Sequence, residues 1–169
     1  SIEKGGKGKI DMSHCCPGGI PNQNVCTQNI ADILVRGANN HPFDFMALQE
    51  ILEDNPHQWP SLLENMNKIQ PDFLSKYGVV FSATPNKKAG IMLIYNNRFT
   101  LKKHITGNLL KPQHSNANKS GRPFQIAVFR EGIIYINLHL PHQEEFNGNL
   151  IEVVTSIING ELRKLDEFR

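Results

Sequence analysis

The sequence has no apolar run long enough to cross a membrane. A spanning helix takes roughly 20 apolar residues, whereas the apolar runs here, such as 45–48 and 133–136, have the length of strands. Internal repeats and low-complexity tracts are also missing. Residues 1–9 are rich in glycine and lysine and lack the apolar segment of a secretory signal, which favours an intracellular location. We therefore expect a flexible lead-in over residues 1–9 and a single domain over residues 10–169.

Cysteine is scarce. The three cysteines, Cys15, Cys16 and Cys26, cannot all pair within the chain, and adjacent cysteines bridge each other only with strain. We therefore expect no disulfide framework and interpret the thiols as small buried side chains. A metal site built from these cysteines and His14 is the alternative, but their spacing matches no usual zinc pattern.

An excess of charge of one sign is also missing. The net charge is +2 and the isoelectric point is near 8.4, which is far from the strongly basic balance of a protein that binds nucleic acid by charge alone. A partner that carries phosphate remains compatible with this charge. The hydrophobic fraction of 39% is ordinary for a globular protein.

Two hydrophobic periods alternate along the chain. Helical spacing predicts helices over residues 24–36, ended by Gly37, over residues 59–69, opened by a capping box of Ser61 and Glu64, and from residue 150 to the end. Strands are predicted over residues 10–16, 43–49, 78–82, 91–95, 101–105, 124–129 and 133–140, with a hairpin between the last two. This order predicts an α/β (α+β) fold with a mixed, mostly antiparallel sheet and outer helices.

Glu50 directly follows the apolar segment 43–49, which has the continuous character of a central strand covered on both faces. A carboxylate at such a strand end emerges at the crevice where α/β folds gather their ligand groups. Magnesium takes oxygen ligands and often only one or two protein carboxylates, so Glu50 is a candidate ligand. The alternative is a solvated glutamate that opens a loop containing Glu53 and Asp54.

Asn137 and His139 interrupt an apolar strand and point to the same face of it. Burying two unpaired polar side chains costs on the order of 1–3 kcal/mol each, so both need partners. A bound ligand is one candidate, and a satisfied structural pair is the other. His142 follows in a turn, where it is either a surface histidine or, with His139, a weak indication of a metal.

Arg122 begins the strand 124–129, where a guanidinium can form paired hydrogen bonds with phosphate oxygens. Lys87 and Lys88 form a small basic loop that either contacts a nucleic-acid backbone or is an ordinary solvated turn.

Together these segments resemble the endonuclease/exonuclease/phosphatase (DNase I-like) superfamily. The segment Asp-Phe-Met-Ala-Leu-Gln-Glu at 44–50 is similar to the family strand that ends in Leu-Gln-Glu. The segment Ala-Gly-Ile-Met-Leu-Ile-Tyr at 89–95 is similar to the next recurrent strand. Gly-Arg-Pro at 121–123, leading to Ile-Asn-Leu-His-Leu at 136–140, is similar to the paired strands that supply an arginine and an active-site histidine.

The resemblance implies part of a two-layer α/β sandwich that hydrolyses phosphoesters with Mg²⁺ or Mn²⁺, with a nucleic acid, DNA or RNA, as the substrate. It implies that Glu50 binds the metal, that His139 hydrogen-bonds the phosphate or transfers a proton, and that Arg122 contacts the phosphate. Asn137 would orient the site, and His142 would help to bind substrate.

The sequence departs from the family pattern in two places. Ser-His-Cys at 13–15 stands where the family's first strand closes with Trp-Asn. The family's later Gly-Asp-x-Asn and Ser-Asp-His segments have no counterpart, so the resemblance implies an N-terminal portion of the domain, completed by further chain or by another chain. Two alternatives stay open: a catalytically inactive relative that acts as a binding or structural module, and a phosphatase for inositol phosphates or lipid headgroups.

Overall fold

The computed structural model describes residues 23–51, 61–83, 90–110, 121–143 and 146–166. The helices are α1 (Gln23–Asn40), α2 (Leu62–Ile69) and α3 (Leu150–Asp166), and a short 3-10 helix spans Phe73–Lys76. The strands are β1 (Phe45–Ile51), β2 (Tyr77–Ala83), β3 (Gly90–Asn96), β4 (Leu101–Asn108), β5 (Pro123–Phe129) and β6 (Ile134–Leu138).

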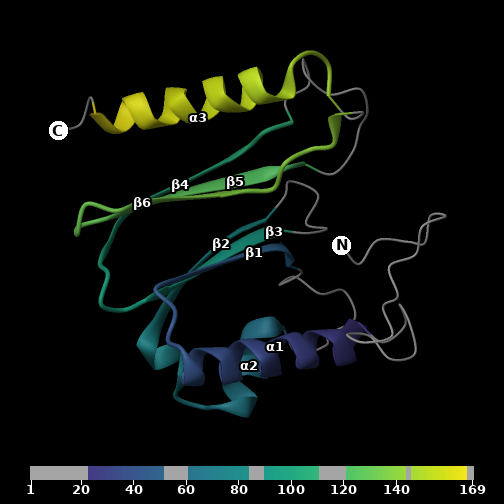
Figure 1. Cartoon of the computed structure of the whole chain (residues 1–169), viewed down its shortest axis with the longest axis vertical. Helices are drawn as coiled ribbons and strands as arrows, with labels where there is room; N and C mark the ends of the chain where they lie inside the picture. Colours follow the sequence, from purple (N-terminus) through teal and green to yellow (C-terminus); the bar gives the residue numbers. More distant parts are fainter. Residues whose placement is uncertain (1–22, 52–60, 84–89, 111–120, 144–145, 167–169) are drawn as a thin grey trace.

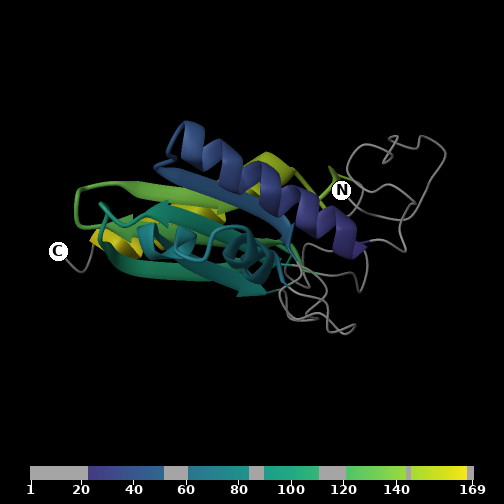
Figure 2. The ribbon, with the colours of Figure 1, turned by 90° about the horizontal axis from the view of Figure 1, so that it is seen from below.

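The described strands form two three-stranded sheets, in the orders β1-β3-β2 and β4-β5-β6. Every described strand pairing is antiparallel. The sheets lie face to face, with α3 over one and α1 and α2 over the other (Figure 1). The view from below shows the two helices crossing the outer face of their sheet (Figure 2). The predicted α/β class, the antiparallel character and the outer helices are confirmed.

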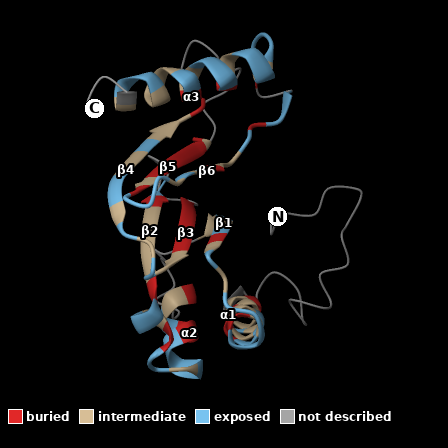
Figure 3. Cartoon of the chain, turned by 60° about the vertical axis from the view of Figure 1, so that its left-hand side comes forward, coloured by how far each residue is buried: buried red, intermediate tan, exposed pale blue. Residues whose placement is uncertain are grey.

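β3, and not the segment around β1, is the central strand of its described sheet. Five consecutive residues from Gly90 are buried in β3, while β1 alternates between buried, exposed and half-buried positions. Among the described strands, burial is most complete in β3 and β5, the central strands of the two sheets (Figure 3). Within the described residues β1 pairs with β3 alone, and the predicted strand 10–16 lies outside them, so the central position expected for 43–49 stays a prediction.

Local sequence signals place the helices, with one exception. The capping box of α2 is present, since the Glu64 amide donates to Ser61 Oγ at 3.2 Å and the Ser61 amide to Glu64 Oε2 at 2.6 Å. Gly37, however, does not end α1, which continues to Asn40. A Cβ at Gly37 would lie 3.3 Å from the ring of Phe43, so this glycine provides close packing instead of a stop.

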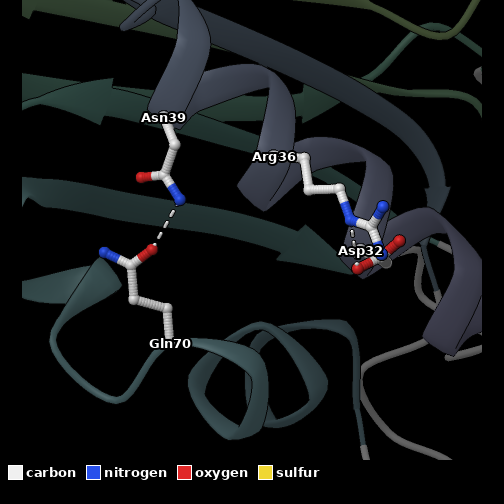
Figure 4. Close-up of polar contacts among 4 residues, drawn as sticks. All are labelled: Asp32, Arg36, Asn39 and Gln70. Atoms are coloured by element: carbon white, nitrogen blue, oxygen red, sulfur yellow. Dashed lines mark hydrogen bonds and ion pairs between the residues drawn. The ribbon is translucent and has the colours of Figure 1, made fainter.

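The extra turn of α1 contacts α2. Asn39 Nδ2 donates to Gln70 Oε1 at 2.7 Å, and one turn earlier Arg36 pairs with Asp32 at 2.9 Å (Figure 4). Contacts with another helix therefore extend α1 beyond the position at which the local sequence predicts its end.

The predicted hairpin joins β5 and β6. Gly132 has a φ of 85°, and its amide donates to the Phe129 carbonyl at 3.1 Å. β6 ends at Leu138, two residues before the predicted end, but the His139 amide still donates to the Pro123 carbonyl at 3.1 Å.

The expectation of free thiols is corrected at Cys26, which is buried and disulfide-bonded. Pairing depends on which segments meet in three dimensions, and three cysteines leave that choice open.

Several predictions concern segments outside the described residues. These are the cysteines Cys15 and Cys16, His14, the predicted strand 10–16, and the basic pair Lys87 and Lys88. Within the described part, no three His, Cys, Asp or Glu side chains gather into a metal site, and no described helix is long and apolar enough to cross a membrane.

Candidate functional site

Glu50 occupies a bulge in β1. Gln49 pairs with Ile91 and Ile51 with Gly90, so the register of β1 against β3 skips Glu50, which is the extra residue of the bulge. Its φ is 58°, the only positive φ at a described residue other than glycine. This left-handed conformation costs an L-residue roughly 1–2 kcal/mol, and bulges of this kind re-aim a side chain.

The bulge changes the face on which the Glu50 side chain lies. In a regular strand, Glu50 would share a face with Met46 and Leu48, which pack in the core beneath α1 and α2. Instead, Glu50 Oε1 lies 3.4 Å from His139 Nε2, across the space between the two sheets. The side chains of Glu50 and His139 are 33% and 15% exposed, so solvent reaches both. The expected convergence of these two strand ends is therefore present.

Asn137 is buried, with 2% of its surface exposed, and it links the two sheets. Its Nδ2 lies within hydrogen-bond distance of the Leu48 carbonyl at 3.4 Å, the Met92 carbonyl at 3.3 Å and Gln125 Oε1 at 3.2 Å. Protein groups therefore provide hydrogen-bond partners for the Asn137 amide, as expected if Asn137 has a structural role. Asn137 lies two residues before His139 on the same strand face, which suits an orienting role, and its predicted part in catalysis remains untested.

The sequence interpretation missed the other members of this polar network. Gln125 is fully buried, and its Nε2 lies 3.1 Å from the Val80 carbonyl, 3.1 Å from Ser82 Oγ and 3.4 Å from His104 Nε2. We call Gln49, Ser82, His104, Gln125 and Asn137 the polar seam. An amide within the apolar run 124–129 was the signal for Gln125, the same kind of signal that identified Asn137.

The polar seam reaches all six described strands through side chains or backbone carbonyls. Burial lowers the pKa of His104, because a low-dielectric environment disfavours the imidazolium. In the neutral form, His104 Nε2 can accept a hydrogen bond from Gln125 Nε2, a nitrogen that only donates. The other end of the space between the sheets is filled by aromatic rings, with Phe45 stacked on Tyr135 at 4.9 Å between centroids.

Arg122 lies at the same end of the molecule as His139, because its neighbour Pro123 accepts the hydrogen bond from the His139 amide. Asn108 fixes the backbone there: its Oδ1 accepts from the Arg122 amide at 2.8 Å and from the Leu110 amide at 3.1 Å. The contact of Arg122 with a phosphate stays a prediction. His142 is exposed, and its predicted part in substrate binding stays a prediction as well.

A carboxylate beside an imidazole, both open to solvent, has a defined chemical capacity. The carboxylate oxygens fit a hard divalent cation, and Mg²⁺ usually keeps several waters while it takes one or two protein carboxylates. The imidazole can donate a hydrogen bond or transfer a proton near neutral pH. The donor set at Glu50 therefore fits a partly hydrated cation better than a closed structural metal site.

Comparisons with known proteins identify similar folds. No protein-family model matches the chain, and no curated protein matches it. Among solved structures, the chain is similar to TDP2 from Caenorhabditis elegans, with 19% identity and a TM-score of 0.48 over 69% of this chain and 30% of that one. It is also similar to ANGEL2, described as a 2′,3′-cyclic phosphatase and solved with adenosine-2′,3′-vanadate, with 16% identity and a TM-score of 0.47 over 66% of this chain and 32% of that one.

The chain thus spans about a third of the length of these two proteins. The likeness lies in the fold, and it does not transfer the activity of TDP2 or ANGEL2 to this chain.

Proposed function

We propose that this chain contributes an active site for magnesium-dependent hydrolysis of phosphoesters, with the phosphodiesters of DNA or RNA as substrates. The observation that carries the proposal is the strained bulge at Glu50, which turns a carboxylate away from the helix-facing side of β1 and places it 3.4 Å from His139. Strain of this kind gathers at functional sites, where the surrounding structure holds it in place.

A structural ion pair explains the bulge less well. The left-handed conformation costs roughly 1–2 kcal/mol, whereas a pair that solvent reaches contributes only about 0–1 kcal/mol. The pair of Glu50 and His139 therefore does not offset the strain by its own attraction. A ligand that binds the Glu50 carboxylate would account for the strained conformation.

Each residue of the candidate site has a separate role in the proposed reaction. Glu50 would hold Mg²⁺ or Mn²⁺, and the bound ion would polarise the phosphate and stabilise the leaving oxygen. His139 would donate a hydrogen bond to the phosphate or transfer a proton, and Asn137 would hold the strand that carries it. Arg122 would pair with phosphate oxygens, and His142 would contact the substrate at the rim. We assign none of the described residues to activating the attacking water.

One observation favours a second candidate, a catalytically inactive relative that binds phosphorylated ligands. Within the described residues, no three His, Cys, Asp or Glu side chains gather around Glu50 into a metal site. Such a module would bind a divalent cation or a phosphate without turnover. A phosphatase for inositol phosphates or lipid headgroups would use the same residues and differ only in the substrate cleaved.

The test is an assay of the full-length protein on plasmid DNA, RNA and phosphoinositides, with Mg²⁺ and with a chelator. We expect chelator-sensitive cleavage that falls at least about a hundredfold in Glu50→Gln and in His139→Ala, because each change removes a charge-stabilising or proton-transferring group. Glu161→Gln and His41→Ala are the matched controls, since Glu161 pairs with Lys164 on α3 and His41 is exposed after α1. Cleavage that persists with chelator, or that Glu50→Gln leaves unchanged, overturns the proposal, and cation binding without cleavage of any substrate supports the inactive relative.

A further inference from the structure

The proposed site lies where two separate sheets meet. Glu50 belongs to the end of β1 and His139 follows the end of β6, and these strands lie in different sheets. Backbone hydrogen bonds fix strands within a sheet, but side chains must fix one sheet against the other. The distance between the two proposed active groups therefore depends on what ties these two strand ends together.

We propose that Gln49 is the positioning residue that sets this distance; the inference rests on the proposed function. Gln49 Nε2 donates to the Leu138 carbonyl at 2.9 Å and to Asn137 Oδ1 at 3.4 Å. Gln49 immediately precedes Glu50, and its two acceptors are the two residues immediately before His139. One carboxamide thus joins the two strand ends, one residue away from each proposed active group.

The chemistry requires an amide at this position. A primary amide nitrogen carries two N–H donors, and the two acceptors on β6 match that number. A carboxylate of the same length accepts hydrogen bonds only, and a thioether of similar length donates none. The tie therefore depends on the Gln49 amide and not merely on the volume of its side chain.

The polar seam fixes the orientation of this tie. Asn137 Oδ1 faces Gln49 because Asn137 Nδ2 is directed towards other acceptors, the Leu48 and Met92 carbonyls and Gln125 Oε1. Gln125 is oriented in turn by the Val80 carbonyl and Ser82 Oγ on β2. The buried amides therefore hold the two acceptors of Gln49 in a single arrangement. This arrangement in turn fixes the position of the end of β1 relative to the end of β6.

The experiment compares Gln49→Met and Gln49→Glu, which preserve side-chain length without the N–H donors, with the matched control Gln70→Met. Gln70 Oε1 also takes part in a hydrogen bond between two elements, since it accepts from Asn39 Nδ2 at 2.7 Å, but near the end of α1 (Figure 4). High-resolution structures and melting temperatures of the full-length variants are measured first. We expect similar shifts in melting temperature, with the contact between Glu50 and His139 lost in both Gln49 variants and retained in Gln70→Met.

Activity gives the second measurement, with bis(p-nitrophenyl) phosphate and Mg²⁺ as the probe. A displacement of about 1 Å costs on the order of a hundredfold in rate, so we expect kcat to fall at least about tenfold in both Gln49 variants while KM stays within about twofold. A purely structural tie would lower the melting temperature and leave kcat unchanged.

The outcomes separate the two proposals. A Glu50–His139 contact that survives in Gln49→Met overturns the positioning role, whatever the activity. A contact that is lost in the Gln49 variants, in a wild-type protein that neither cleaves phosphoesters nor binds Mn²⁺, overturns the proposed function and leaves Gln49 as the group that sets this distance. A loss of kcat in Gln70→Met equal to that in Gln49→Met contradicts the inference.

Discussion

Replacing Glu50 by alanine and by glycine separates the strain of the bulge from the contribution of its carboxylate. Both variants lose the contact with His139, but only glycine removes the Cβ that makes a φ of 58° unfavourable. The left-handed conformation costs an L-residue roughly 1–2 kcal/mol, and glycine avoids this cost. The greater conformational freedom of glycine in the unfolded chain destabilises the folded state by roughly 0.5–1 kcal/mol, which offsets part of the gain. We therefore expect Glu50→Gly to be more stable than Glu50→Ala by about 0.5–1 kcal/mol.

The lost contact contributes little to this comparison. Both side chains of the pair are open to solvent, and such pairs contribute about 0–1 kcal/mol, so Glu50→Ala should be close to the wild type in stability. The assay is urea unfolding, read as a shift of the midpoint at constant slope, which reports a change in stability. Glycine at this position should thus preserve the fold while abolishing any activity that needs the carboxylate. A Glu50→Gly variant that is less stable than Glu50→Ala would refute the argument that Glu50 is strained.

Two further predictions concern the rest of the fold. Burial lowers the pKa of His104 from its usual 6.5, so the stability that neutral His104 contributes is fully present above about pH 6.5 and is lost as the pH falls through the lowered value. The unfolding free energy of the wild type relative to His104→Gln should therefore decrease between about pH 7.5 and about pH 5, and a difference that is constant with pH would contradict this. A Cβ at Gly160 in α3 would meet no atom within 4 Å outside the backbone of its own helix, whereas a Cβ at Gly90 would lie 2.5 Å from the Ser82 carbonyl oxygen. Gly160→Ala should stabilise the protein by about 1 kcal/mol and Gly90→Ala should destabilise it, as thermal unfolding would show; equal effects would contradict the packing described.

Local chemistry made several elements predictable. The capping box at Ser61 and Glu64 involves neighbours in the sequence, so it could be identified before any packing was known. The hairpin between β5 and β6 was predictable for the same reason, because a short turn with glycine joins two apolar segments. The polar face of β6 could be identified because alternation places Asn137 and His139 on one side.

Contacts between distant segments determined what the sequence did not show. The bulge at Glu50 depends on the register of β1 against β3, and no signal in residues 43–51 specifies that register. The partners of Asn137 come from β1, β3 and β5, so its satisfaction within the protein could not be separated from ligand binding beforehand. Gln49 was passed over because a glutamine next to a candidate metal ligand carries no signal until β6 is placed beside it.

The most direct test of the account is a titration of the full-length protein with Mn²⁺, followed by NMR of the histidine side chains. Paramagnetic broadening falls steeply with distance, so an ion held by Glu50 should broaden the His139 signals first, at concentrations that leave His41 and His104 sharp. Glu50→Gln should abolish this broadening, and Glu161→Gln should preserve it. Broadening of His139 that is unchanged in Glu50→Gln, or broadening confined to other histidines, would contradict a divalent cation site at Glu50.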